Sequence, residues 1–330
     1  MQPEQVAAYL QHKMPDAREI EVSQLVRIPG GASRETWSCD ATWREGKARA
    51  GRGLIIRRDP EASLLETERY VEFRVYQALQ GTGVPVPEVF WLETDPQWLE
   101  RPFFVMGRLQ GEASPQTVLQ SSSVDAIAQH KVDVLARIHN LDWHALGLDF
   151  LGAPDGPRAC AAREIDWWER ILRQDQLEPQ PALELAIAWL RAHQPVAQKV
   201  ALVHADYRTG NLLINGDRIA GVLDWEMVHL GDPIEDVAWV CLRSWRWAGD
   251  ALVGGLLPRE EFYRRYEAAG GLSVDPEAVR FWEVLGNLKL AVIFVTGTRS
   301  FCEGRSKDAI HAFTTFQNAD IESEILRLIS

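Results

Sequence analysis

Hydrophobic and polar positions follow two different rhythms along the chain. Before residue 107, short stretches alternate apolar and polar residues and a buried run occupies 103–106, which indicates strands. After residue 107, apolar residues mostly recur three and four apart, which indicates helices. Helices are expected at 1–20, 61–80, 123–140, 165–174, 181–193, 276–298 and 310–330, and strands at 22–29, 35–43, 53–58 and 103–106. The pattern predicts an α+β protein with a domain boundary near residue 107.

One β-rich segment, residues 200–225, interrupts the helical part. An Asn-Gly dipeptide at 215–216 separates two apolar stretches, and this dipeptide favours a hairpin because both residues tolerate positive φ. Asn211 opens one arm and Asp224 closes the other, so antiparallel arms bring both residues to the same edge of the ribbon. Asp206 lies on the loop that leads into this edge. The sequence therefore predicts that three oxygen-bearing side chains converge there.

These side chains suit magnesium-dependent phosphoryl transfer. Asn211 and Asp224 offer hard oxygen ligands, which Mg²⁺ prefers, and we take them as candidate metal ligands. Phosphoryl transfer depends on positioning and on neutralising charge, so a carboxylate that orients the attacking hydroxyl is needed. Asp206 is the candidate catalytic base, and Arg208, two residues further on, is a candidate for steadying the transferred group.

A metal-dependent hydrolase is a second interpretation of the same region. His204, Asp206, Asp224 and His229 would form a mixed metal cluster. The chain has no HExxH or HxH spacing, and this interpretation leaves Asn211 without a role. Neither GxGxxG nor GxxxxGK[ST] occurs, which disfavours nicotinamide and P-loop enzymes.

A resemblance covers the same motif. The pattern His204-x-Asp206-x4-Asn211 resembles the catalytic loop of protein kinases, and Asp224 resembles the metal-binding aspartate of their DFG motif. The block at 204–236 resembles the aminoglycoside phosphotransferase family, which includes choline and homoserine kinase relatives. Within it, the chain is most similar to the kinase-like domain associated with acyl-CoA dehydrogenases, to which the segments 30–36 and 137–142 also fit. The resemblance implies a two-lobed, protein-kinase-like fold, with an N-lobe at 1–107, a C-lobe at 108–330, and ATP or GTP with Mg²⁺ as cofactors.

The resemblance also assigns nucleotide-binding residues in the N-terminal part. They comprise a phosphate-covering turn, a basic residue with its helix partner, and a hinge residue: Gly30, Gly31, Ser33, Arg57, Glu72 and Met106. Arg57 stands where the kinase pattern has lysine; arginine keeps the charge but differs in shape. Alternatively, the glycine pair is an ordinary turn, and the Arg57 and Glu72 charges are solvated. The departure at Arg57 also motivates a catalytically inactive, kinase-fold binding protein as a further alternative.

Composition narrows the class of partner. The chain has 330 residues, 46% of them hydrophobic, and a net charge of −12, which is unfavourable for binding nucleic acid. Its four cysteines form no CxxC pair, the N-terminus shows no signal-peptide core and no apolar run is long enough for a membrane span, so we expect a cytoplasmic protein that does not bind membranes.

The expected substrate is a small hydroxylated molecule. An aminoglycoside-like compound, an amino alcohol and a hydroxyacyl thioester all remain open, as do ATP against GTP and the oligomeric state. Of the 13 tryptophans, Trp167, Trp168, Trp245 and Trp247 are candidates either for lining a substrate groove or for packing.

Overall fold

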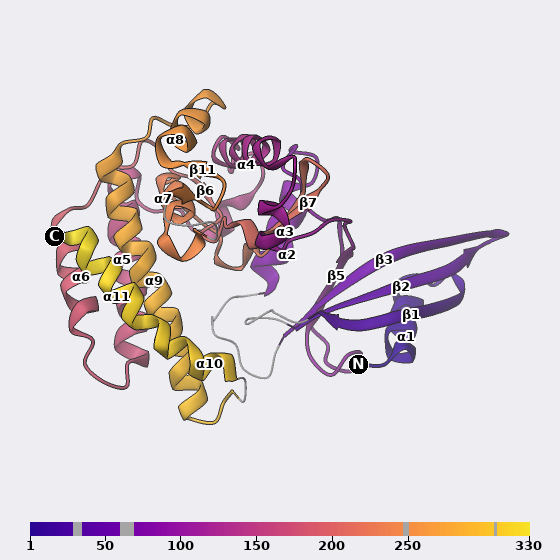
Figure 1. The fold of residues 1–330 in the computed structure, drawn as a ribbon. Coiled ribbons are helices and arrows are strands. Elements are labelled where there is room, and N and C mark those ends of the chain that lie inside the picture. Colours follow the sequence, from indigo (N-terminus) through magenta and orange to yellow (C-terminus); the bar gives the residue numbers. More distant parts are fainter. Residues whose placement is uncertain (29–34, 60–68, 247–250, 307–308) are drawn as a thin grey trace. The chain divides into compact units, whose positions relative to one another are not determined.

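The computed structural model describes residues 1–28, 35–59, 69–246, 251–306 and 309–330 (Figure 1). The predicted phosphate-covering residues Gly30, Gly31 and Ser33 lie outside the described residues. The chain forms two compact units, one made of Met1–Gln80 with Val86–Gln110 and the other of Gly81–Pro85 with Gly111–Ser330. The predicted boundary at 107 lies near the third crossing between the units, after Gln110, and a short segment of the expected N-lobe, 81–85, belongs to the second unit.

The first unit is a five-stranded antiparallel sheet in the order β1-β2-β3-β5-β4 (Figure 1). Its elements are α1 (Pro3–Lys13), β1 (Arg18–Ile28), β2 (Glu35–Glu45), β3 (Ala48–Arg58), α2 (Arg69–Leu79), β4 (Val89–Glu93) and β5 (Phe103–Gly107). Alternate residues of β2, including Cys39 and Ala41, are buried against Tyr9 and Leu10 of α1. The strand prediction is confirmed in outline, but the first helix ends at Lys13 and β4 was not predicted.

The second unit is mostly helical. Its longer helices are α4 (Val124–His139), α5 (Cys160–Asp175), α6 (Pro181–Ala192), α7 (Ile234–Cys241), α8 (Arg259–Ala268), α9 (Pro276–Cys302) and α11 (Asn318–Ile329), and the short ones are α3 (Pro115–Leu119) and α10 (Ala309–Phe313). Helix α9 begins where the Asp275 carboxylate accepts a hydrogen bond from the Glu277 amide, with Pro276 as first helical residue. It is buried along most of its length and packs against α5, α6, α7 and α11, so it forms the centre of this unit (Figure 1).

Three two-stranded ribbons lie among these helices: β6 (Ala201–Val203) with β9 (His229–Gly231), β7 (Leu212–Asn215) with β8 (Arg218–Val222), and β10 (Leu252–Val253) with β11 (Leu257–Pro258). The hairpin predicted at 215–216 is confirmed, because Asn215 pairs with Arg218 and Gly216 has a φ of 65°. The pairing of β6 with β9 was not predicted. Within the described residues, no helix combines the length and apolar character needed to cross a bilayer.

Candidate active site

The loop between β6 and β7 is held by a buried carboxylate of α7. The two Asp236 carboxylate oxygens accept hydrogen bonds from the backbone amides of His204 and Ala205, both at 2.8 Å. His139 of α4 contacts the same carboxylate at 3.1 Å. Burial opposes ionisation of Asp236, but the hydrogen bonds from His139 and from the His204 amide lower its pKa below the ordinary value. The loop that carries Asp206 is thus fixed at its start by an ionised side chain.

His204 supports the loop from within. Its Nδ1 accepts a hydrogen bond from the Asp206 amide at 3.2 Å, which assigns the proton to Nε2, and Nε2 donates to the Leu223 carbonyl at 2.9 Å. Burial lowers the pKa of His204, so the ring is neutral. Both ring nitrogens are occupied by backbone partners, so His204 does not act as the metal ligand that the hydrolase interpretation required.

Asp206 is the most heavily contacted side chain of the loop. Asn211 Nδ2 donates to Asp206 Oδ2 at 2.6 Å, and the indole Nε1 of Trp239 donates to Asp206 Oδ1 at 2.9 Å. Arg208 Nε lies 3.2 Å from Oδ1, and the carboxylate remains 17% exposed. Three donors therefore fix the orientation of a carboxylate that solvent still reaches, as a base acting on an external hydroxyl requires.

The predicted metal ligands lie at one end of the β7–β8 ribbon. The Leu223 amide donates to the Asn211 carbonyl at 2.9 Å, which extends the hairpin ladder by one step and places Asp224 directly after it. Because the Asn211 amide nitrogen faces Asp206, its amide oxygen is the atom left for a cation. Asp224 has a left-handed backbone with φ 61°, a conformation that aspartate tolerates better than most residues. The Asp224 carboxylate and the Asn211 amide oxygen are hard oxygen donors, which is the ligand type that fits Mg²⁺.

Arg208 belongs to the same group of side chains. Its guanidinium stacks over the ring of Trp245 at 5.1 Å from the ring centroid, and Trp245 lies 5.8 Å from Trp239. The side chain is 29% exposed, so its charge is oriented rather than fully solvated. Of the four tryptophans considered from sequence, Trp245 stacks on Arg208 beside the candidate base, Trp168 is buried and Trp167 is exposed, while Trp247 lies outside the described residues.

A buried lysine braces the middle of the loop. Lys131 of α4 donates to Thr209 Oγ1 at 3.2 Å, and Thr209 donates to the Gly254 carbonyl at 3.0 Å. Lys131 is 2% exposed, and burial lowers its pKa to about 7. Thr209 sits between Arg208 and Asn211, so this lysine helps to fix the spacing of the two candidate residues.

In the first unit, the structure pairs two of the predicted nucleotide-binding residues. Arg57 Nε of β3 lies 3.4 Å from Glu72 Oε1 of α2, with side-chain exposures of 8% and 0%. They are therefore not solvated surface charges. Met106 lies on β5, paired with Ile55 of β3 and with Val89 of β4, and is buried.

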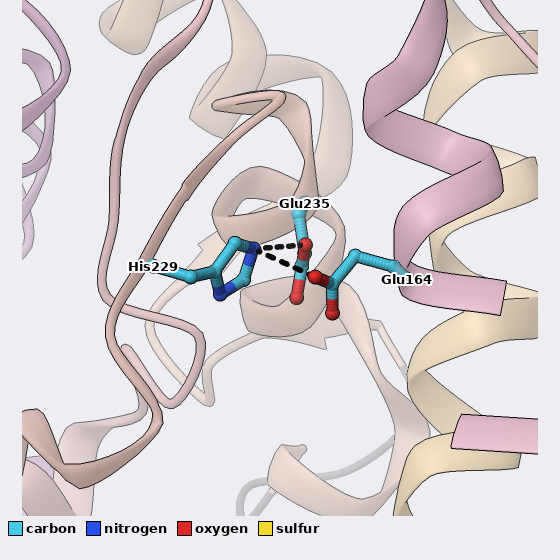
Figure 2. Close-up of side chains that lie close together, drawn as sticks. All are labelled: Glu164, His229 and Glu235. Carbon is cyan, nitrogen blue, oxygen red and sulfur yellow. Dashed lines mark hydrogen bonds and ion pairs between the residues drawn. The ribbon is translucent and has the colours of Figure 1, made fainter. Parts of the chain in front are cut away.

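A second cluster of ionisable side chains lies below the loop. Glu164 of α5, His229 of β9 and Glu235 of α7 bring their potential ligand atoms within 4.8 Å of one another (Figure 2). Burial opposes a charge on His229, but the two carboxylates outweigh it and raise its pKa to about 9. Its Nδ1 then donates to the Met227 carbonyl and its Nε2 to Glu235, at 3.2 and 3.1 Å.

Lys289 supplies the second positive charge of this cluster. Its Nζ lies 3.2 Å from the other Glu235 oxygen, so two cations already neutralise the two carboxylates. The three residues could hold a metal ion by geometry alone, but the contacts describe an internal ion network. The His229 imidazole is engaged there, so the structure does not bring it to Asp206 as the hydrolase interpretation supposed.

Sequence reasoning missed three residues that contact the loop: Lys131, Trp239 and Lys289. Each lies on a helix with apolar neighbours, where a tryptophan or lysine gives no local sign of which residue it meets. The one available signal was the unusual presence of a lysine among apolar residues at 284–295, which predicts a paired charge but not its partner.

The chain is similar to known proteins over most of its length. Residues 24–282 match the model of the family described as "Phosphotransferase enzyme family". Acyl-CoA dehydrogenase family member 10 of Mus musculus is 32% identical over 234 residues, covering 66% of this chain and 22% of that protein. Probable acyl-CoA dehydrogenase IBR3 of Arabidopsis thaliana is 29% identical, covering 74% and 33%. The chain thus spans a third or less of the length of these relatives.

A shorter relative and two solved structures complete the comparison. Hygromycin-B 4-O-kinase of Escherichia coli is 25% identical, covering 66% of this chain and 61% of that protein. A Ralstonia eutropha structure provisionally assigned as an aminoglycoside phosphotransferase is 23% identical, with a TM-score of 0.74 and coverage of 99% and 98%. A thermostable mutant of APH(4)-Ia with ADP and hygromycin B gives 20% identity, a TM-score of 0.59 and coverage of 98% and 97%. The predicted kinase-like α+β fold is confirmed.

Proposed function

The chain belongs to the phosphotransferase enzyme family, and from this premise we propose that it transfers the γ-phosphoryl group of ATP or GTP to a hydroxyl group of a small molecule, with Asp206 as catalytic base. Family membership confirms the predicted enzyme class, a small-molecule kinase. One observation carries the assignment of the base: the Asn211 amide and the Trp239 indole each donate to a different oxygen of Asp206, which is still accessible to solvent.

In the proposed reaction, the acceptor hydroxyl oxygen forms a bond to the γ-phosphorus while the bond from that phosphorus to the bridging oxygen breaks. The nucleoside diphosphate leaves, and the hydroxyl proton passes to Asp206. The two donors on Asp206 fix one lone-pair direction toward the hydroxyl, which reduces the orientational freedom lost on reaching the transition state. Arg208, oriented by Trp245, would offset the negative charge of the transferred group.

Asn211 and Asp224 would hold Mg²⁺ at the end of the β7–β8 ribbon. Bound there, Mg²⁺ would neutralise phosphate charge and orient the nucleotide phosphates. The chain's own contribution is rigidity, because the Asn211 amide nitrogen is fixed by Asp206 and the Asn211 carbonyl is fixed by Leu223. The donor set supports this role, and the intact base and ligand positions argue against an inactive binding protein.

Arg57, Glu72 and Met106 would serve the nucleotide in the first unit. The buried Arg57–Glu72 ion pair supports this part of the proposal, because a charge held at a fixed position can meet a phosphate. ADP is bound in a structural relative, and AMP-PNP in another. We propose ATP as the donor to test first and GTP as the second.

For the acceptor, we propose a hydroxyacyl thioester first, with aminoglycosides and amino alcohols as the other classes. The relatives with the higher identities are named acyl-CoA dehydrogenases, whereas the aminoglycoside kinase is 25% identical. A kinase for hydroxyacyl thioesters would act on acyl-CoA compounds, which is the substrate class that the names of these dehydrogenases give. This inference concerns the acceptor alone and leaves the proposed base unchanged.

The deciding experiment is a nucleotide-consumption screen at fixed Mg²⁺ with three sets of acceptors: hydroxyacyl-CoA thioesters, aminoglycosides including hygromycin B, and amino alcohols. Asp206→Asn serves as the blank, since it keeps the shape and loses the base. We expect release of the nucleoside diphosphate with one acceptor class, reduced by at least about a thousandfold in the blank. Equal turnover by the blank would rule out Asp206 as base, and thioester inactivity alongside aminoglycoside turnover would overturn the acceptor.

A binding measurement tests the metal ligands separately. Mg-ATP should raise the melting temperature of the wild-type protein, and Asp224→Ala should remove most of that rise. Asp217→Ala, an exposed residue in the turn of the same hairpin, is the matched control and should keep the rise. An undiminished rise in Asp224→Ala would contradict the assignment of Asp224.

A further inference from the structure

The amino group of Lys289 contacts Ala205, the residue directly before the proposed base Asp206. Lys289 is on the buried helix α9, is 1% exposed, and its Nζ donates to the Ala205 carbonyl at 3.0 Å. Ala205 has a φ of 67°, a left-handed conformation that is unfavourable for a residue other than glycine. Such a conformation persists where the surroundings hold it in place.

The surroundings hold Ala205 on both sides. Its amide donates to Asp236 Oδ1 at 2.8 Å, and its carbonyl accepts from Lys289. An anion fixes the donor and a cation fixes the acceptor of the same residue, and both partners are buried. The direction in which the chain enters Asp206 therefore depends on the pair Asp236 and Lys289.

Lys289 reaches Asp206 by a second route. Its Nζ lies 4.8 Å from the ring centroid of Trp239, the residue whose indole donates to Asp206 Oδ1. A cation on the face of an indole draws electron density from the ring and makes the N–H a stronger donor. The same ammonium group thus binds the backbone carbonyl before Asp206 and contacts the indole ring that donates to the Asp206 carboxylate.

The ion network explains how a charge persists at this depth. An isolated ammonium group in a protein interior would be strongly destabilised. Glu235 of α7 faces Lys289 at 3.2 Å, while His229 of β9 and Glu164 of α5 complete a set of two cations and two anions (Figure 2). Glu235 gives the Lys289 ammonium group a partner of opposite charge at this depth, and the same ammonium group contacts the Ala205 carbonyl and the Trp239 ring.

We propose that Lys289 is a positioning residue for phosphoryl transfer, fixing the orientation of Asp206 through the Ala205 carbonyl and the Trp239 indole. This inference rests on the proposed function, since it takes Asp206 as the base. Lys289 itself touches neither nucleotide nor acceptor in this scheme. Its loss should lower kcat and leave KM for the nucleotide nearly unchanged.

The test removes the buried ion pair as a pair. In Lys289→Met with Glu235→Gln, the ammonium is replaced by an apolar chain of similar length and the facing carboxylate is neutralised, so no unpaired charge remains. The matched control is Arg259→Met with Glu283→Gln, which removes a bidentate ion pair at 2.7 Å, also involving α9, from a site outside the loop. Both double variants are expected to lose stability, and both are measured as folded proteins.

The first readout needs no substrate. In a ¹⁵N–¹H spectrum of the full chain, the Trp239 indole signal is assigned by its disappearance in Trp239→Phe. We expect this signal to move upfield and to exchange faster with solvent in the Lys289 double variant, because the hydrogen bond to Asp206 weakens. It should stay in place in the Arg259 double variant. An unmoved signal in the Lys289 double variant overturns the proposal.

The second readout is turnover of Mg-ATP in two backgrounds, with the active acceptor class from the screen or with water. In the wild-type background, the Lys289 double variant should lose about tenfold in kcat. In the Asp206→Asn background it should cause no further loss, because the side chain that it orients is no longer a base. Equal losses in both backgrounds indicate a general structural effect and overturn the inference, whereas full activity of Asp206→Asn alone overturns the proposed function instead.

Discussion

The indole nitrogen of Trp239 lies 2.9 Å from Oδ1 of Asp206, although 33 positions separate the two residues in the chain. Trp239 is buried in α7, the helix whose first turn also supplies Asp236 to the start of the same loop. One short helix therefore fixes both the backbone before Asp206 and the carboxylate itself.

Trp239→Phe should separate the hydrogen bond from the packing. The phenyl ring keeps much of the buried surface but cannot donate to Asp206, and a hydrogen bond to a charged group contributes about 1.5–3 kcal/mol. We expect kcat to fall about tenfold with KM for ATP changed less than about threefold. Trp282→Phe is the control, since it removes another buried indole bond to a carboxylate, that of Asp232 at 3.0 Å. An equal fall in both variants would mean that the loss reflects packing.

Substitution of Arg57 tests the nucleotide role of its ion pair with Glu72. Arg57→Met removes the charge and should raise KM for ATP by about tenfold or more, whereas Arg57→Lys, which keeps the charge, should stay closer to wild type. The measurement is the KM for ATP at saturating acceptor.

The matched control for Arg57 lies on the same strand. Arg52→Met removes the charge of an exposed arginine that pairs with Glu88 at 3.1 Å, and it should leave KM for ATP unchanged. If Arg57→Met behaves like Arg52→Met in the folded state, the proposed nucleotide role of Arg57 is wrong.

Lys131→Met should raise stability at neutral and lower pH. Burial lowers the folded-state pKa of Lys131 to about 7 from 10.5. Between these two pKa values, the unfolded chain therefore binds more protons at this site than the folded chain does. Because of this difference, the free energy of unfolding of the wild-type protein increases as pH rises from about 7 to 10.5. The lost hydrogen bond to Thr209 offsets part of the gain. We expect the free energy of unfolding of Lys131→Met to exceed that of the wild type by about 2 kcal/mol at pH 6, and we expect this difference to shrink toward pH 10.

Urea unfolding at a series of pH values measures this effect. Lys47→Met, in the exposed turn between β2 and β3, should differ from wild type by less than about 0.5 kcal/mol throughout. A gain for Lys131→Met that does not depend on pH would show that it arises from hydrophobic burial and not from proton release.

His229→Gln should lower the free energy of unfolding at neutral pH, and this loss should disappear at alkaline pH. The folded-state pKa of about 9 is raised above the ordinary 6.5, so this contribution is complete below about pH 6.5 and is lost as pH rises through 9. We expect the variant to be roughly 2–3 kcal/mol less stable at pH 6.5, with the difference narrowing between about pH 6.5 and 9 and nearly gone at pH 10. Urea unfolding across this range is the measurement.

An exposed histidine pair provides the comparison for His229. His144 contacts Asp149 at 2.7 Å with both side chains more than half exposed, so His144→Gln should have little effect at any pH. A constant difference between His229→Gln and wild type from pH 6.5 to 10 would mean that the imidazole is neutral in the folded state.

The sequence by itself determined those features that local chemistry controls. The Asn-Gly turn specified the hairpin at 215–216, and the hairpin placed Asn211 and Asp224 at one end of a ribbon, because antiparallel pairing relates residues close in the chain. Apolar spacing predicted most of the long helices for the same reason. The resemblance to the kinase family predicted Glu72 as the helix partner of Arg57, and the structure pairs these two residues. Their roles in binding and catalysis remain predictions.

Tertiary packing decided the rest. Trp239 lies on α7 and Lys289 on α9, and no periodicity tells which loop a buried polar side chain will meet. Likewise β9 pairs with β6 across a long chain separation. Such contacts form only when distant segments are packed together, since the energy of a buried charge or hydrogen bond depends on the whole surrounding interior rather than on neighbouring residues in sequence.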